Sequence, residues 1–246
     1  MKMHQALTVF LAFAGGVLPV LAQVPFPAPA NRAVVPAARL GNKTWTARHN
    51  RFLEEAKKGD IDLLFVGDSL TANWEKYPEL WKKKFGKFKA ANFGIGGDQT
   101  EHLLYRLQSG ELDGIQPKVV VLLIGTNNMS KSLKYTPEQI AEGAAADIRE
   151  IQKHVPEATI LLVSIFPREI PLDDWLNVKN ADTNAFLRKL ADGKKVVYVD
   201  LWNLFRNPDG TVSKDFYADR THINERGYER YADALLPEIK KFLQVP

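Results

Sequence analysis

Five apolar segments of strand length alternate along the chain with stretches that repeat at helical spacing. The segments cover residues 61–66, 88–93, 119–124, 160–165 and 196–199. Three of them are almost continuously apolar, which is typical of parallel strands that are covered on both faces. Alternation of such strands with helices predicts right-handed βαβ units and a three-layer α/β/α sandwich. In folds of this class, ligands bind beyond the carboxyl ends of the strands.

The clearest helical pattern follows the third apolar segment. Residues 136–139 (Thr-Pro-Glu-Gln) have the form of a capping box with proline at the first helical position, and apolar residues then recur every three or four positions up to Ile151. A second apolar stripe covers residues 228–242 and contains Pro237. We expect this proline to kink or shorten the last helix.

The first 44 residues differ in composition from the rest. Lys2 precedes an apolar run that ends in small residues, the pattern of a secretory signal peptide cleaved after Ala22. The run is too short, and too often broken by glycine and proline, for a membrane-spanning helix. Residues 23–44 are rich in proline and alanine, which predicts an extended linker. We therefore expect a signal peptide over residues 1–22, a secreted or periplasmic location, and one folded domain over residues 45–246.

Composition narrows the classes of partner and of stabilising bond. The formal net charge is +4, and the lysines are scattered apart from the run at residues 82–84. Because no basic stripe alternates with aromatic residues, we expect no nucleic-acid partner. The chain has no cysteine, so its stability must come from a hydrophobic core, which a domain of about 200 residues can form. Once the leader is removed, no further segment predicts a membrane span.

Four polar motifs lie where the fold class predicts a site, just after strands. Taken singly, each has a simpler structural explanation, such as a helix cap for Ser69, a phosphate-binding turn for the glycines at 94–97, and turn formation for the two asparagines. Their occurrence together, in this order, favours a catalytic site. The motifs are residues 67–70 (Gly-Asp-Ser-Leu), 94–98 (Gly-Ile-Gly-Gly-Asp), 125–128 (Gly-Thr-Asn-Asn) and 219–222 (Asp-Arg-Thr-His).

Ser69 becomes a candidate nucleophile only if a base can reach it. Of the five histidines, only His222 is predicted on a loop at the expected edge of the sheet; the others fall in the leader or in helical patterns. Asp219, three residues earlier, can accept the imidazole N–H and orient the ring. A metal site is the other chemical interpretation of Asp219, His222 and Glu225. With no cysteine and no second histidine nearby, these residues make a poor zinc site, and we expect no metal.

If such a serine attacks an ester, the carbonyl oxygen becomes an oxyanion, and the site needs hydrogen-bond donors aimed at it. One such donor is worth about 10²–10³ in turnover. Three candidates follow the strands. They are the backbone N–H of Ser69, the backbone N–H of Gly97 and the side-chain amide of Asn127.

These residues resemble the four conserved blocks of the SGNH, or GDSL, hydrolase family, which carry Gly67-Asp68-Ser69, Gly97, Asn127 and Asp219-x-x-His222. Within that family, residues 92–98 and the stretches around them are most similar to the platelet-activating-factor acetylhydrolase alpha-subunit type. The resemblance implies a flavodoxin-like five-stranded parallel sheet of order 2-1-3-4-5. It also implies Ser69 as nucleophile, His222 as base and Asp219 as its orienter, with the three oxyanion donors named above and no cofactor. Neighbouring residues expected to support the site or line its pocket are Asp68, Leu70, Asp98, Asn128, Phe166 and Arg168.

The predicted activity is hydrolysis of short-chain esters, chiefly acetyl esters, through an acyl-serine intermediate. Acetylhydrolase alpha subunits are intracellular dimers, whereas exported relatives look like carbohydrate deacetylases, so the predicted substrate is an acetylated glycan or lipid. Two alternatives stay open. One is acyl transfer to a sugar hydroxyl, and the other is a non-catalytic carbohydrate- or lipid-binding protein on the same scaffold. The second is disfavoured because all five expected site residues are present.

Overall fold

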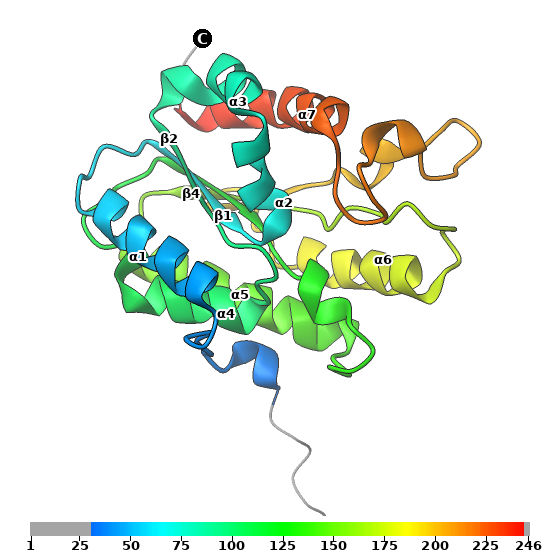
Figure 1. The fold of residues 1–246 in the computed structure, drawn as a ribbon, viewed down its shortest axis with the longest axis horizontal. Coiled ribbons are helices and arrows are strands. Elements are labelled where there is room, and N and C mark those ends of the chain that lie inside the picture. Colours follow the sequence, from blue (N-terminus) through cyan, green and yellow to red (C-terminus); the bar gives the residue numbers. More distant parts are fainter. Residues whose placement is uncertain (1–30, 244–246) are drawn as a thin grey trace, which may run out of the picture. The chain divides into compact units, whose positions relative to one another are not determined.

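A parallel sheet of five strands lies at the centre of the computed structural model, which describes residues 31–243 (Figure 1). The strand order is β2-β1-β3-β4-β5. Both the three-layer architecture and the order predicted from the sequence are therefore confirmed. The strands are β1 (Leu63–Gly67), β2 (Ala90–Gly94), β3 (Val119–Leu123), β4 (Thr159–Val163) and β5 (Val196–Val199).

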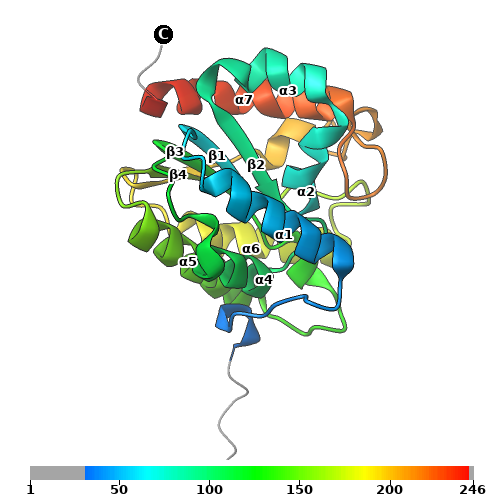
Figure 2. The same ribbon diagram turned by 60° about the vertical axis from the view of Figure 1, so that its left-hand side comes forward.

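Helices cover both faces of the sheet (Figures 1 and 2). One layer contains α1 (Lys43–Ala56), α4 (Thr100–Arg106), α5 (Pro137–His154) and α6 (Trp175–Arg188). The opposite layer contains α2 (Ser69–Ala72), α3 (Pro78–Phe85) and α7 (Glu225–Leu243). Short helical turns connect these elements: η1 (Arg32–Val34), η2 (Asn73–Lys76), η3 (Gly86–Phe88), η4 (Leu107–Glu111), η5 (Thr126–Met129), η6 (Trp202–Phe205) and η7 (Lys214–Phe216).

The central strand β1 shows why its sequence is continuously apolar. All five of its residues are buried. Leu64 and Val66 belong to the core beneath α1, α4 and α5, whereas Leu63 and Phe65 belong to the core beneath α3 and α7. Because successive side chains of a strand point to opposite faces, a strand covered on both sides needs an apolar residue at every position.

Both predicted amphipathic helices form, but the last one is not shortened at its proline as expected. Thr136 and Gln139 make the expected capping box, in which the Gln139 N–H donates to Thr136 Oγ1 (3.1 Å) and the Thr136 N–H donates to Gln139 Oε1 (3.0 Å). The last helix, α7, is not shortened by Pro237. It continues because Leu235 and Ile239, on either side of the proline, are both buried against the sheet.

Residues 31–42 form a segment, here called the N-terminal strap, that crosses the ends of α4 and α5. The prediction places these residues in the linker, but the strap packs onto the domain. Ala33 is fully buried, its carbonyl accepts a hydrogen bond from Thr100 Oγ1 (3.1 Å), and the Ala37 N–H donates to the Glu101 carbonyl (2.9 Å). The amino-acid composition does not reveal this packing, because the strap makes these contacts through its backbone groups. The predicted signal peptide, residues 1–22, lies outside the described residues.

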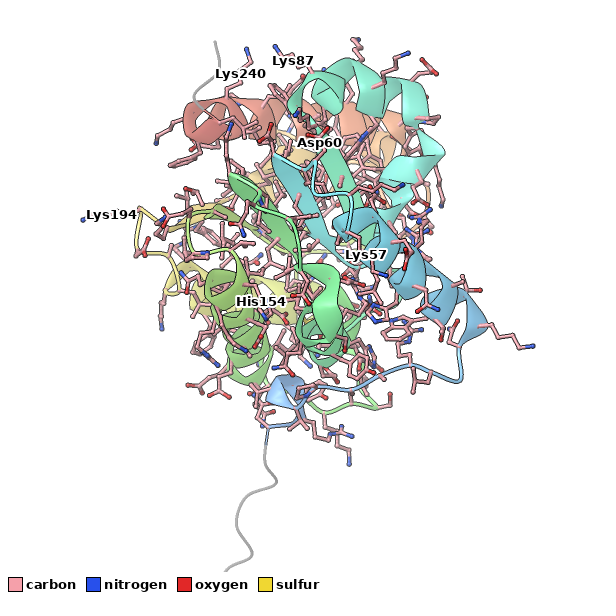
Figure 3. All side chains as sticks on the ribbon, turned by 90° about the vertical axis from the view of Figure 1, so that its left-hand side faces the viewer. Lys57, Asp60, Lys87, His154, Lys194 and Lys240 are labelled. Atoms are coloured by element: carbon pink, nitrogen blue, oxygen red, sulfur yellow. The ribbon has the colours of Figure 1, made fainter. Side chains whose placement is uncertain are left out.

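The edge of the sheet where the strands begin is charged. Figure 3 shows Lys57, Asp60, Lys87, His154 and Lys194 at this edge, on segments that lead into the strands or end the preceding helices. The four polar motifs lie beyond the opposite ends of the strands, as the fold class requires.

Gly143 of α5 lets the strap approach the helix. A β-carbon built there would lie 2.3 Å from Thr100 Oγ1 and 2.9 Å from the Ala33 carbonyl oxygen. Although alanine favours helix by about 1 kcal/mol, we expect Gly143→Ala to lower the free energy of unfolding by about 1–3 kcal/mol through overpacking. Gly41→Ala is the matched control, because a β-carbon at Gly41 meets nothing within 4 Å. Urea unfolding measures both, and an unchanged or higher stability of Gly143→Ala would contradict the close packing.

Candidate active site

The structure brings Ser69, His222 and Asp219 together at the carboxyl end of the sheet. Ser69 begins α2 directly after β1, and the other two residues lie on the loop before α7. Ser69 Oγ lies 2.9 Å from His222 Nε2, and His222 Nδ1 lies 2.8 Å from Asp219 Oδ2. A carboxylate can only accept, so Nδ1 carries the proton and Nε2 is left to accept from the Ser69 hydroxyl. This is the tautomer in which histidine can act as a base toward serine.

The loop that carries Asp219 and His222 is held by its own hydrogen bonds. Asp219 Oδ1 accepts from the backbone N–H groups of Thr221 (2.7 Å) and His222 (2.8 Å). Desolvation raises the pKa of Asp219, but these backbone hydrogen bonds and the imidazole outweigh it and lower the pKa to about 2. Asp219 is therefore ionised at neutral pH.

Gly97 lies on a tight turn after β2. The Asp98 N–H donates to the Ile95 carbonyl (3.2 Å), and Gly97, at the third position of this turn, has a φ of +79°. A type II turn requires a positive φ at that position, which glycine adopts without strain. The turn lies against Ser69, because a β-carbon at Gly96 would be 3.8 Å from the Ser69 β-carbon. The Gly97 backbone is exposed beside Ser69.

Asn127 lies on η5, directly after β3. Its Nδ2 donates to the Asp98 carbonyl (2.9 Å), and its own carbonyl accepts from Gln99 Nε2 (3.4 Å). These bonds join the loop after β3 to the turn after β2. A primary amide has two N–H groups, so one can hold Asp98 while the second faces a substrate.

Asp68 precedes the candidate nucleophile and is fully buried. Its Oδ1 caps α2 by accepting from the Leu70 N–H (2.9 Å), whereas Oδ2 has no hydrogen-bond partner among the described residues. Burial raises the pKa of this carboxyl to about 7; the Leu70 N–H acts in the opposite sense, and the nearby charge of Asp98 adds to the rise.

Arg168 joins two of the loops. Its Nη1 donates to Thr221 Oγ1 (2.7 Å), next to His222, and its Nη2 donates to the Thr126 carbonyl (3.2 Å), next to Asn127. The side chain is half-buried, and desolvation lowers its pKa. Arg168 therefore ties the loop of the candidate base to the loop of a candidate oxyanion donor.

Three other predicted supporting residues lie in the interior. Phe166 packs in the core against Phe205 (4.8 Å between ring centroids), so it contributes to the core and not to a pocket wall. Asn128 is buried and donates to Glu101 Oε2 (2.9 Å), holding the start of α4. Leu70 is also buried, and its carbonyl accepts from the Tyr228 hydroxyl (2.7 Å), which ties α2 to α7.

A buried charge cluster beneath the Gly97 turn was not predicted from the sequence. The Asp98 carboxylate is fully buried and accepts from Trp45 Nε1 (2.8 Å), Arg106 Nε (2.8 Å) and Arg39 Nη1 (3.1 Å). Arg106 also pairs with the buried carboxylate of Glu111. No local pattern marks these partners, since Arg39 and Asp98 lie 59 positions apart. The only signal was Asp98 itself, an acidic residue at the end of a glycine-rich motif.

A cleft lies near the loop that carries Asp219 and His222. It has a volume of about 970 Å³ and lies between residues 169–174 and 206–214, with Arg220 at its margin. Arg220 follows Asp219 in the sequence, and its carbonyl accepts from the Glu169 N–H (3.0 Å); Ser69 and His222 themselves do not line the cleft. Seven of its thirteen lining residues are charged: Glu169, Asp173, Asp174, Arg206, Asp209, Lys214 and Arg220.

Among residues 31–243, no group of three or more histidine, aspartate or glutamate side chains is placed to hold a metal ion. No helix in that part of the chain combines the length and apolar composition needed to cross a bilayer.

Comparison with known proteins agrees with this arrangement. The GDSL-like lipase/acylhydrolase family model matches residues 65–230. The chain is 37% identical over 222 residues to the platelet-activating factor acetylhydrolase IB subunit alpha2 of Homo sapiens, covering 87% of this chain and 93% of the relative. It is 36% identical over 197 residues to the alpha1 subunit of Rattus norvegicus, covering 79% and 82%.

Solved structures share the fold. A GDSL-like lipase from Bacteroides thetaiotaomicron superposes with a TM-score of 0.63 at 20% identity, covering 79% of this chain and 98% of that one. An acetylxylan esterase from Geobacillus stearothermophilus superposes with a TM-score of 0.60 at 20% identity, covering 74% and 96%.

These relatives correct one prediction and establish another. The prediction of a secreted or periplasmic location is wrong, because the chain matches, over most of its length, alpha subunits of the intracellular acetylhydrolase type. The apolar N-terminal run that suggested export lies outside the described residues. The prediction of the family and of the class of enzyme is confirmed: the chain belongs to the GDSL-like lipase/acylhydrolase family and is an ester hydrolase.

Proposed function

We propose that Ser69 is the nucleophile of this hydrolase and that His222 and Asp219 activate it. The 2.9 Å contact between Ser69 Oγ and His222 Nε2 carries the proposal. Oγ attacks the ester carbonyl carbon while Nε2 takes its proton, which forms a tetrahedral intermediate. The intermediate expels the alcohol, which receives that proton from His222. Water then attacks acyl-Ser69 with His222 as base, releasing the acid and restoring the Ser69 hydroxyl.

Three donors are proposed to bind the oxyanion of each tetrahedral intermediate. They are the Ser69 N–H at the start of α2, the Gly97 N–H and one N–H of Asn127 Nδ2. In support, Gly97 is exposed on a turn beside Ser69, and Asn127 is fixed to that same turn through the Asp98 carbonyl. Donors held in place before the reaction stabilise developing charge without a cost of reorganisation.

The proposed substrate is an acetyl ester of a polar alcohol, of which an acetylated carbohydrate is an example. The acyl group is inferred from the acetylhydrolase relatives, to which the chain is 37% identical. The alcohol is inferred from the cleft beside Arg220, because seven of the thirteen residues that line it are charged and can hydrogen-bond hydroxyl groups. The cleft reaches Arg220, the residue after Asp219, so an alcohol bound there is proposed to extend from the ester held at Ser69.

Replacement of the nucleophile tests the mechanism. Ser69→Ala should lower kcat for p-nitrophenyl acetate by at least about 10³-fold, because no hydroxyl remains to form the acyl-enzyme, while the unfolding temperature stays close to that of the wild type. Ser130→Ala is the matched control, since the Ser130 side chain is exposed and its hydroxyl bonds only Ser132 among the described residues. Wild-type turnover by Ser69→Ala would refute the mechanism.

Narrowing the cleft tests the alcohol site. Leu172 is a half-exposed lining residue, and Leu172→Trp should raise KM for an acetylated xylo-oligosaccharide about tenfold, as the loss of about 1.4 kcal/mol of contact energy would do. KM for p-nitrophenyl acetate should stay unchanged, because that small alcohol does not reach the cleft. Val178→Trp on α6, outside the cleft, should change neither value. Equal effects of Leu172→Trp on the two substrates would argue against the site.

The buried carboxyl of Asp68 gives a pH test that needs no substrate. Its pKa of about 7 in the folded state exceeds the value of about 3.9 in an unfolded chain. The free energy of unfolding of the wild type therefore falls as the pH rises from about 4 to about 7. Asp68→Asn keeps an acceptor for the Leu70 N–H but does not titrate. The variant should be more stable than the wild type at pH 8, by up to about 4 kcal/mol, and lose this advantage by pH 4. A difference in unfolding free energy that does not vary with pH would contradict the pKa.

A further inference from the structure

The guanidinium group of Arg39, in the N-terminal strap, lies against the turn that carries Gly97. Its Nη1 donates to the Gly96 carbonyl (2.9 Å) and to Asp98 Oδ1 (3.1 Å). A β-carbon built on Gly97 would lie 3.2 Å from both Nη1 and Nη2. Arg39 therefore binds the residues on both sides of Gly97 and packs against Gly97 itself. The side chain is 24% exposed.

The turn has little means of holding its own shape. One backbone hydrogen bond, from Asp98 to Ile95 (3.2 Å), lies within the turn, and a second holds its first residue, Ile95, to Gly67 (3.1 Å). Two of its four residues are exposed glycines. Glycine has the largest conformational freedom to lose, so such a turn needs bonds from outside to present an N–H in one direction. Arg39 supplies the bond to the carbonyl of the peptide whose N–H belongs to Gly97. It therefore fixes the plane of that peptide.

Arg39 also balances the charge beneath the turn. The buried Asp98 carboxylate belongs to the residue after Gly97, and its charge would repel an oxyanion bound by the Gly97 N–H. Arg106 offsets part of this charge but is shared with the buried Glu111, which also contacts His49 Nδ1 (2.7 Å). Arg39 is the second guanidinium group that pairs with Asp98, and its loss would leave the shared Arg106 as the remaining one.

We propose that Arg39 is a positioning residue of the oxyanion hole, which aims the Gly97 N–H and neutralises Asp98. This inference rests on the proposed function, in which that N–H binds the oxyanion. Arg39 precedes residues 65–230, the part of the chain that the family model matches. Arg39 would thus give one residue of a segment that composition marks as a linker a positioning role in the site, whereas Arg32 of the same segment contacts Leu133 and Tyr135 instead.

The test is steady-state turnover of p-nitrophenyl acetate by Arg39→Ala and Arg39→Lys. A whole oxyanion donor is worth about 10²–10³ in kcat, so misdirecting one should lower kcat of Arg39→Ala about 10- to 100-fold while KM changes less than about threefold. Added methylguanidinium should restore part of the lost kcat in Arg39→Ala and none in Ser69→Ala. Arg39→Lys should be intermediate, because an ammonium keeps the charge but not the planar group that packs on Gly97.

Arg32→Ala is the matched control from the same strap. Arg32 donates to the Leu133 carbonyl (3.2 Å) and lies over the Tyr135 ring, away from the Gly97 turn. Its loss should leave kcat within about twofold of the wild type. Equal losses of kcat in Arg32→Ala and Arg39→Ala would overturn the inference, because they would show that the strap acts only by stabilising the fold. So would wild-type kcat in Arg39→Ala.

Ser69→Ala, assayed in parallel, separates this inference from the proposed function. If Ser69→Ala is inactive and Arg39→Ala has wild-type kcat, only the role of Arg39 fails. If Ser69→Ala keeps wild-type turnover, the proposed mechanism fails and the role of Arg39 fails with it.

Discussion

The hydrogen bond between Ser69 Oγ and His222 Nε2 joins two parts of the chain that are 153 positions apart. Ser69 is placed by β1, the second strand of the sheet in space, and His222 by a loop that the start of α7 holds. The two side chains meet only because the sheet has the order β2-β1-β3-β4-β5 and α7 returns to the face of β1. Tyr228 of α7 supports this contact, because its hydroxyl donates to the carbonyl of Leu70, the residue after Ser69.

Around that contact, polar side chains join the three loops that carry Gly97, Asn127 and His222. Arg168 joins the loop of His222 to the loop of Asn127, and Asn127 is bound in turn to the carbonyl of Asp98. Asp98 is held by guanidinium groups from two further elements. Each loop is thus fixed by side chains from another loop or helix, which is how exposed backbone can be held rigid enough to bind a transition state.

Patterns that are local in sequence predicted most of the fold and singled out the residues of the candidate site. Continuous apolar segments identified the five strands, and the capping box at residues 136–139 identified the start of α5, because both depend on neighbours within a few positions. The resemblance of four short motifs to a family supplied the strand order. What was missed depends on distant partners: the strap was assigned to a linker, Phe166 to the pocket, and Arg39 and Arg106 were not singled out. Charge pairs and backbone contacts between residues far apart leave no periodic signal.

The most direct test of the account is to find which atom an organophosphonate ester modifies. Reaction of the protein with a p-nitrophenyl phosphonate, followed by intact mass and peptide mapping, should show one adduct per chain, on Ser69. The same reaction with His222→Ala should leave Ser69 unmodified over that time, because no base accepts its proton. Modification of a different residue, or equally fast modification of Ser69 without His222, would contradict the proposal that these two side chains form the catalytic pair.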